Sequence, residues 1–248
     1  MLAKSPQRFD DCIFQVCLAN QYSAAKELTN FLIQMENGDF DLGEDEEEVV
    51  PKPEGGEDDD DDDDGQGINK EKKFLAALER SMGNETAMNA KQMESNLGTQ
   101  VKFGQTIQLK HRKSQKFLTV DSMVVASVER ENLRVFLSDT GSSLSWFTLK
   151  PWFKIDRENA DMETNAAVLL QVAERSQEQV HCSEMSLSKR RDGDREVNCS
   201  LDRTGWRICV YSEYHDGGKD LFAGEIVQLF DPEKLSYLRL LEEHGKDR

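Results

Sequence analysis

The chain has 248 residues and a formal net charge of −17, but residues 44–64 hold fourteen acidic residues and one lysine, which leaves −4 for the rest. The rest of the chain is therefore nearly neutral, so its charge gives no support to nucleic-acid binding. Its apolar runs are shorter than the ~20 residues of a membrane helix, and its first residues lack a secretory signal pattern, which indicates a soluble chain. The five cysteines are widely spaced and contain no Cys-x-x-Cys pair, which indicates a reducing compartment.

The first hundred residues predict a strand followed by a helical arm. Alternating apolar residues over 9–18 predict a buried strand. The apolar period then becomes helical over residues 22–36, and it returns over 69–82 and, more weakly, over 84–97. Between these helices, residues 37–67 are rich in glycine, proline and acidic side chains, including seven consecutive aspartates. Such a segment buries too little apolar surface to offset its ordering entropy, so we expect it to be disordered.

After Gly98 the pattern changes to short strands separated by turn residues. The predicted strands are residues 101–103, 106–110, 116–120, 133–137, 145–149, 167–172, 180–182 and 206–211. Many short strands without intervening helices favour a β-barrel or a β-sandwich.

An internal repeat favours one of these architectures. The segment Gly104-Gln-Thr-Ile-Gln-Leu109 returns 120 positions later as Gly224-Glu-Ile-Val-Gln-Leu229, and an aromatic-Leu pair follows each copy at the same spacing. A weaker copy around Val168-Leu-Leu170 lies about halfway between them. Three-fold repetition in a strand-rich chain indicates a β-trefoil, whose repeats build a closed barrel. The predicted fold is mainly β: an incomplete β-trefoil interrupted by a helical arm with a disordered acidic insertion.

Residues 231–245 have two interpretations. The sequence Asp231-Pro232-Glu233 is a good helix start, and leucines follow at helical spacing. The internal repeat instead makes Tyr237-Leu238 a strand. The sequence leaves both interpretations open.

Several motifs, in order along residues 6–238, resemble a known family. They are Pro6-x-Arg8-Phe9-x-Asp11-Cys12-x-Phe14-x-x-Cys17, Asn20-x-Tyr22-Ser23-Ala24, Ser114-x-Lys116-Phe117-Leu118-Thr119-Val120, Ser145-Trp146-Phe147-x-Leu149-x-Pro151, Val197-Asn198-Cys199 with Trp206-Arg207-Ile208, and the two strong repeat copies. Together they resemble the amino-terminal suppressor region of inositol 1,4,5-trisphosphate receptors, which are related to ryanodine receptors.

The resemblance implies a domain organisation. Residues 1–221 are expected to form a suppressor-like β-trefoil, in which 22–97 are the helical arm and 37–67 the acidic segment, and 222–248 are expected to begin a second, truncated trefoil. The family has further strands before the segment that residues 9–18 match. Its ligand pocket and membrane pore lie beyond residue 248, so the chain is expected to be a fragment of a channel.

The same resemblance implies a function. The chain is expected to be a regulatory region at the cytosolic face of the endoplasmic reticulum membrane, part of a ligand-gated calcium-release channel. There it tempers ligand affinity, couples to gating, and contacts the rest of the channel chain and the neighbouring subunits of a homotetramer. Inositol trisphosphate is expected to bind only when downstream domains are present. Pro151, Trp152, Phe153 and Lys154 fall on the loop that makes the inter-domain contact, where the family often has tyrosine in place of Phe153.

A cluster of basic residues is a possible anion contact. Lys110, Arg112, Lys113 and Lys116 lie on or beside one predicted hairpin, and Ser188-Lys-Arg-Arg191 is a second basic patch. Both patches fit either solvated loop residues or a contact with an anionic lipid, an inositol phosphate or the acidic segment.

An acidic motif matches the calcium-loop pattern of EF-hands. Asp60, Asp62 and Asp64 precede Gly65, and Glu71 follows at the required spacing. Prolines and glycines upstream exclude the entering helix. We therefore predict weak calcium binding and no firm metal site.

Catalytic patterns are absent from the sequence. The predicted strands carry no Ser-His-Asp arrangement, phosphate loop or paired carboxylates, and the four histidines lack metal-ligand spacing. The sequence therefore predicts neither an enzyme nor a cofactor. The alternative to a channel region is a stand-alone soluble β-trefoil adaptor that binds protein partners through its acidic arm and basic loops. A carbohydrate-binding trefoil would repeat an aromatic-plus-Asp/Asn site in each lobe, and the sequence shows no such repetition.

Overall fold

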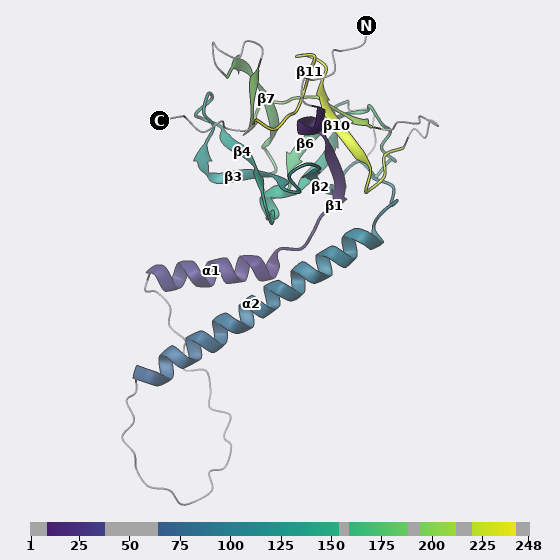
Figure 1. Ribbon diagram of the computed structural model, residues 1–248. Coiled ribbons are helices and arrows are strands. Elements are labelled where there is room, and N and C mark those ends of the chain that lie inside the picture. The colour runs from purple at the N-terminus through teal and green to yellow at the C-terminus, as the bar shows by residue number, and fades with distance from the viewer. Residues whose placement is uncertain (1–8, 38–63, 154–158, 188–193, 212–219, 242–248) are drawn as a thin grey trace, which may run out of the picture. The chain divides into compact units, whose positions relative to one another are not determined.

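A computed structural model describes residues 9–37, 64–153, 159–187, 194–211 and 220–241, although the side chains of 64–69 are not described (Figure 1). The chain divides into two compact units, one of residues 1–20 with 92–248 and the other of residues 21–91. The described helices are α1 (Ser23–Asn37) and α2 (Asp64–Ser95), with short 3₁₀ turns η1 (Phe9–Cys12) and η2 (Ser143–Ser145). The described strands are β1 (Phe14–Leu18), β2 (Thr106–His111), β3 (Phe117–Val125), β4 (Leu133–Ser138), β5 (Phe147–Pro151), β6 (Ala167–Val172), β7 (Gln179–Ser186), β8 (Arg195–Ser200), β9 (Trp206–Val210), β10 (Ile226–Asp231) and β11 (Ser236–Tyr237). The prediction of a mainly β chain is confirmed.

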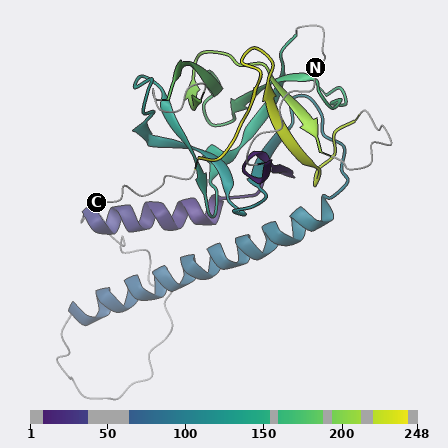
Figure 2. The same cartoon turned by 45° about the horizontal axis from the view of Figure 1, so that its top comes forward.

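Six strands of the first unit close into a ring. Each of β1, β2, β5, β6, β9 and β10 pairs antiparallel with the next, and β10 returns to β1. Figure 1 shows this last pairing, where the purple β1 lies beside the yellow β10. Two hairpins, β3–β4 and β7–β8, extend from the ring, and β11 pairs with β10 (Figure 2). This arrangement is that of a β-trefoil, in which closure of the barrel removes exposed strand edges.

The three sequence repeats become three equivalent lobes. Gly104, Asn165 and Gly224 each precede a barrel strand in a left-handed conformation, with φ of 85°, 66° and 94°. Five residues after each of them comes a fully buried leucine: Leu109, Leu170 and Leu229. Asparagine is the residue that best tolerates the left-handed region after glycine. The middle copy therefore keeps the backbone geometry while losing the glycine, which explains its weak sequence signal.

Backbone hydrogen bonds connect the three lobes. The N–H of Val101 donates to the carbonyl of Leu221 at 2.8 Å, that of Leu221 to Met162 at 2.8 Å, and that of Met162 to Val101 at 3.0 Å. All three side chains are fully buried. Because each lobe donates once and accepts once, the lobes are joined in a closed cycle that satisfies buried backbone groups.

The third lobe comes from the carboxyl-terminal part of the described chain. Val227 of β10 lies opposite Phe14 of β1 on one side and Val210 of β9 on the other. In addition, the N–H of Gly224 donates to the carbonyl of Val16 at 2.7 Å. The domain boundary expected after residue 221 therefore falls inside one sheet, because β10 fills the gap between β1 and β9.

The same pairing decides between helix and strand after Asp231. The Asp231 carboxylate accepts the N–H groups of Glu233 at 2.9 Å and Lys234 at 3.2 Å, which makes a turn. The chain then returns as β11, in which Tyr237 lies opposite Phe230. The strand interpretation is correct here, because β10 provides the backbone hydrogen-bond partners that β11 needs.

The second unit contains α1 and most of α2. The two helices predicted over 69–82 and 84–97 form the single helix α2, because Gly83 costs only about 1 kcal/mol relative to alanine in a helix interior. The helix begins at Asp64, so residues 64–67 are helical, although they were expected to be part of the disordered segment. Residues 38–63 lie outside the described part.

A glutamate of α2 caps the start of α1. The Glu85 carboxylate accepts the Ser23 hydroxyl at 2.8 Å and the N–H groups of Ala24 at 3.1 Å and Ala25 at 3.2 Å. Partial burial raises the pKa of Glu85, but these hydrogen bonds outweigh it and hold that pKa below its usual value. The cap fixes α1 against α2 inside the arm.

Candidate interaction surface

The loop after β5 is organised around one tryptophan. The backbone N–H of Trp152 donates to the carbonyl of Ala167 at 3.0 Å, which continues the pairing of β5 with β6. Its indole ring lies against Gly205, where an added Cβ would come within 3.0 Å of the ring. The Arg203 guanidinium lies 4.8 Å from the ring centroid, a cation–π contact. The backbone of β5, the glycine and the arginine together fix the orientation of the ring.

The predicted inter-domain contact residues are only partly described. Pro151 ends β5, and Phe153 is 54% exposed. Lys154 lies outside the described residues. The structure therefore provides an anchored Trp152 followed by an exposed Phe153, which is an arrangement that suits a contact with another protein surface.

Sequence reasoning missed the residues that complete this surface. Ala167 of β6 lies opposite Arg207 of β9, so one row across three adjacent strands contains Trp152, Ala167 and Arg207. Residues in one row share a face of the sheet, and this face is the outer one because the neighbouring Trp206 is buried. The sequence shows no local motif that links β5 to β9, because the link depends on the pairing of both with β6.

The basic hairpin is brought together, but two of its four charges are compensated. Lys113 pairs with Asp11 at 3.0 Å, and Lys116 pairs with Asp139 at 3.0 Å. Lys110 lies over the Phe117 ring, 5.6 Å from its centroid. Arg112, the fourth predicted residue, is an exposed residue in the turn between β2 and β3. Paired charges attract anions less, so this hairpin is a weaker anion contact than its sequence indicates. The second basic patch, residues 188–191, lies outside the described residues.

The calcium pattern does not form a loop in the described part. Asp60 and Asp62 lie outside the described residues, and the side chain of Asp64 is not described. Asp64, Gly65 and Glu71 all belong to α2. A helical backbone through Gly65 replaces the sharp turn that an EF-hand loop requires at this glycine. The described residues also contain no group of three or more His, Cys, Asp or Glu that is arranged to hold a metal ion.

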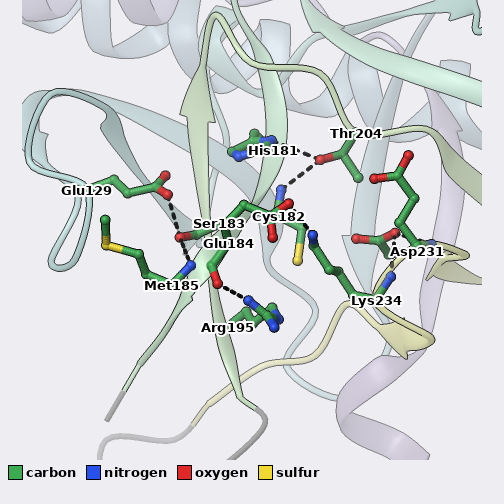
Figure 3. Close-up of polar contacts among 11 residues, drawn as sticks. Glu129, His181, Cys182, Ser183, Glu184, Met185, Arg195, Thr204, Asp231 and Lys234 are labelled. Carbon is green, nitrogen blue, oxygen red and sulfur yellow. Dashed lines mark hydrogen bonds and ion pairs between the residues drawn. The ribbon is translucent and has the colours of Figure 1, made fainter.

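A polar network stabilises the β7–β8 hairpin (Figure 3). Glu129 accepts the hydroxyl of Ser183 at 2.6 Å and the amide of Asn198 at 2.8 Å. Burial raises the pKa of Glu129, but these hydrogen bonds outweigh it and keep that pKa below its usual value. On the same strand, His181 bonds the Thr204 hydroxyl at 2.9 Å. Because Ser183 is fully buried, this network has a structural role in the hairpin.

Two ion pairs attach the third lobe to the same hairpin. Lys234 pairs with Glu184, and Arg239 pairs with Asp194 at 2.5 Å. Figure 3 shows Lys234 and Asp231 on the segment that passes β7. The third lobe is therefore held by polar contacts as well as by strand pairing.

None of the described helices is both long and apolar enough to span a membrane. Residues 66–217, more than half of the chain, match the sequence model of the inositol 1,4,5-trisphosphate/ryanodine receptor family. The chain is 25% identical over 243 residues to the inositol 1,4,5-trisphosphate receptor itr-1 of Caenorhabditis elegans, in an alignment that covers 95% of this chain and 7% of that receptor.

Two solved structures are also similar to parts of the chain. The SDF2-like protein of Arabidopsis thaliana aligns with a TM-score of 0.49 and 18% identity over 60% of this chain and 82% of that protein. The protein O-mannosyltransferase Pmt1–Pmt2 complex of S. cerevisiae bound to the sugar donor aligns with a TM-score of 0.48 and 16% identity over 58% of this chain and 21% of that chain.

Proposed function

The chain belongs to the inositol 1,4,5-trisphosphate/ryanodine receptor family, and from this we propose that it is the amino-terminal regulatory region of an inositol trisphosphate receptor-like calcium-release channel. In that role it lies at the cytosolic face of the endoplasmic reticulum membrane and tempers the ligand affinity of domains that follow it. Its partners are the rest of the channel chain and the neighbouring subunits of a homotetramer. The chain spans 7% of the worm receptor, so ligand pocket and pore are assigned to other parts of such a channel.

The loop after β5 carries this proposal. Trp152 is fixed by Gly205 and Arg203, while Phe153 projects with more than half of its surface exposed. A rigid anchor beside an exposed aromatic residue is typical of protein contacts, because little side-chain entropy is lost on binding. We propose that this loop transmits the regulatory effect to the ligand-binding domains.

A fusion experiment tests the regulatory role. The chain is joined ahead of the part of the worm receptor that follows its region of similarity, and the Kd for inositol 1,4,5-trisphosphate is measured with and without the chain. Coupling between protein sites typically changes affinity by about fivefold or more. We expect the chain to weaken ligand binding by at least about this factor and to bind no ligand by itself.

Variants assign the effect to the loop. Phe153→Ala is expected to restore much of the affinity, because it removes the exposed contact while leaving the anchor in place. Met123→Ala, a substitution at an 88% exposed apolar residue of β3, serves as the control and should change nothing. An unchanged Kd on fusion of the whole chain contradicts the regulatory role.

Fractionation of source cells separates the channel from the adaptor. An antibody against residues 98–211 is expected to detect a band far larger than 28.3 kDa in the membrane fraction. A soluble band near 28.3 kDa instead supports a stand-alone adaptor, and the channel function is then abandoned.

A further inference from the structure

The surface around Trp152 has a specific chemical character. We call the outer face formed by Trp152, Arg203 and Arg207 the basic-aromatic face, and the exposed Phe153 follows Trp152 directly in the chain. Both arginines are exposed, one above the Trp152 ring and the other in its row across β6. Adjacent strands lie about 4.8 Å apart, so the backbones of Trp152 and Arg207 are about 10 Å apart along this row. The face therefore presents an aromatic ring with a cation on it and a second cation two strands away.

Within the described residues, the charges of this face have no carboxylate partner. In the described part of the chain, no acceptor bonds the Trp152 indole N–H, and neither Arg203 nor Arg207 pairs with a carboxylate. The other two tryptophans differ, because Trp146 donates to the Asn20 carbonyl and Trp206 to the Val180 carbonyl, both at 2.9 Å. Because no described carboxylate compensates the two arginine charges, the face is locally positive and suits an acidic ligand.

We propose that the basic-aromatic face binds an acidic protein segment that carries an apolar side chain between its carboxylates. This inference rests on the proposed function, since it specifies the partner chemistry of the same loop. Arginine guanidinium groups bind carboxylates through paired N–H donors. The exposed Phe153 provides an apolar contact for the apolar side chain of the segment.

A protein segment suits this face better than a phosphate group does. Phosphate sites commonly use helix N-termini or backbone nests, whereas this face consists of side chains from β9 and from the segments after β5 and before β9. Two arginines on separate residues match two carboxylates of an acidic segment. The exposed Phe153 provides an apolar contact that a phosphate group does not need.

The three tryptophans provide the assay. In the full chain, the indole N–H resonance of Trp152 is assigned by its loss in Trp152→Phe, and the two internally bonded indoles serve as references. The probe is a synthetic peptide of four Glu-Glu-Leu repeats, and the matched peptide has four Gln-Gln-Leu repeats. We expect the glutamate peptide to shift the Trp152 resonance and leave the other two in place.

Charge variants identify the contact. Arg203→Gln and Arg207→Gln are each expected to weaken peptide binding by about tenfold, because each loses a charge-assisted hydrogen bond. Arg130→Gln, at an exposed arginine in the connection between β3 and β4, is the control and should bind as the unmodified chain does.

Two outcomes overturn the proposal. A response to inorganic phosphate or inositol 1,4,5-trisphosphate without a response to the glutamate peptide identifies an anion site of another kind. Equal responses to the glutamate and glutamine peptides, or none to either, exclude an acidic segment. The fusion titration with Phe153→Ala is read independently, so the regulatory role can hold even when the acidic partner is rejected.

Discussion

Leu229→Ala tests whether the third lobe is part of the barrel. Leu229 is fully buried in β10 and lies opposite Ile208 of β9, which is also fully buried. If residues 226–238 close the barrel, truncating this leucine leaves a cavity among core side chains. If that segment is only the loose start of another domain, the same truncation removes little buried surface.

The three-fold repetition provides two equivalent positions with which the stability loss of Leu229→Ala can be compared. Leu109 and Leu170 occupy the equivalent positions of the other lobes, and all three leucines are 0% exposed. Leucine-to-alanine changes at buried positions typically cost 2–5 kcal/mol in the free energy of unfolding. We therefore expect about 3 kcal/mol for each of the three variants, because each one removes the same atoms from an equivalent layer of the barrel.

Urea unfolding and hydrogen exchange provide the measurements. Unfolding is followed by the fluorescence of the buried Trp206. Exchange is followed at the amide of Val16, which donates to the Glu225 carbonyl at 3.0 Å across the β1–β10 seam. Leu229→Ala should accelerate exchange at this amide. Barrel closure by the third lobe is refuted if Leu229→Ala lowers the free energy of unfolding by less than about 1 kcal/mol while each of the other two variants lowers it by about 3 kcal/mol.

Three further predictions follow from single contacts. Gly205→Ala should displace the ring of Trp152, because the new Cβ would lie 3.0 Å from that ring, and the Trp152 indole resonance should shift. Such overpacking should lower the free energy of unfolding by about 1–3 kcal/mol. Glu196→Ala should lower the urea midpoint by removing the carboxylate that accepts three backbone N–H groups of residues 127–129 at 2.6, 2.9 and 3.3 Å, at a cost of about 2 kcal/mol. Glu85→Gln should weaken the cap of α1 and reduce helicity measured by circular dichroism. Because the folded-state pKa of Glu85 is lowered, its carboxylate contributes fully to stability above the ordinary pKa of 4.5, and this contribution is lost as pH falls through the lowered pKa. The helicity of the unmodified arm should therefore decrease below pH 4.5, whereas the helicity of the Gln variant should change less with pH.

Most of the barrel was predictable because its strands alternate and its repeats are local signals. The ranges predicted over 106–110 and 167–172 agree closely with β2 and β6. In contrast, β8 (Arg195–Ser200) was missed. Its apolar residues Val197 and Cys199 are separated by the buried Asn198, whose amide donates to Glu129. Three polar residues of β8, Glu196, Asn198 and Ser200, are buried, so this strand buries polar side chains where sequence reasoning expects apolar ones.

The candidate surface was only half predictable. Sequence resemblance identified Trp152 and Phe153, but it gave no indication that Arg203, Gly205 and Arg207 lie beside them. These residues reach the loop only because β6 pairs with β5 on one side and β9 on the other. Pairing between strands distant in sequence is set by closure of the whole barrel, and no short segment encodes it.

Barrel closure and the candidate surface share one strand. Arg207 of β9 lies between Ala167 of β6 and Phe230 of β10. Strand β10 of the third lobe therefore pairs with the edge of β9 opposite β6. Strand β9 supplies Arg207 and begins directly after Gly205. If β10 leaves its place, β9 becomes an edge strand and the support beneath the Trp152 ring loosens. A substitution that opens the β1–β10 seam, such as Leu229→Ala, is thus expected to broaden the Trp152 indole resonance, although Leu229 lies in the barrel core and Trp152 on the outer face. An unchanged Trp152 resonance beside accelerated exchange at Val16 would show that β6 alone is sufficient to hold the surface.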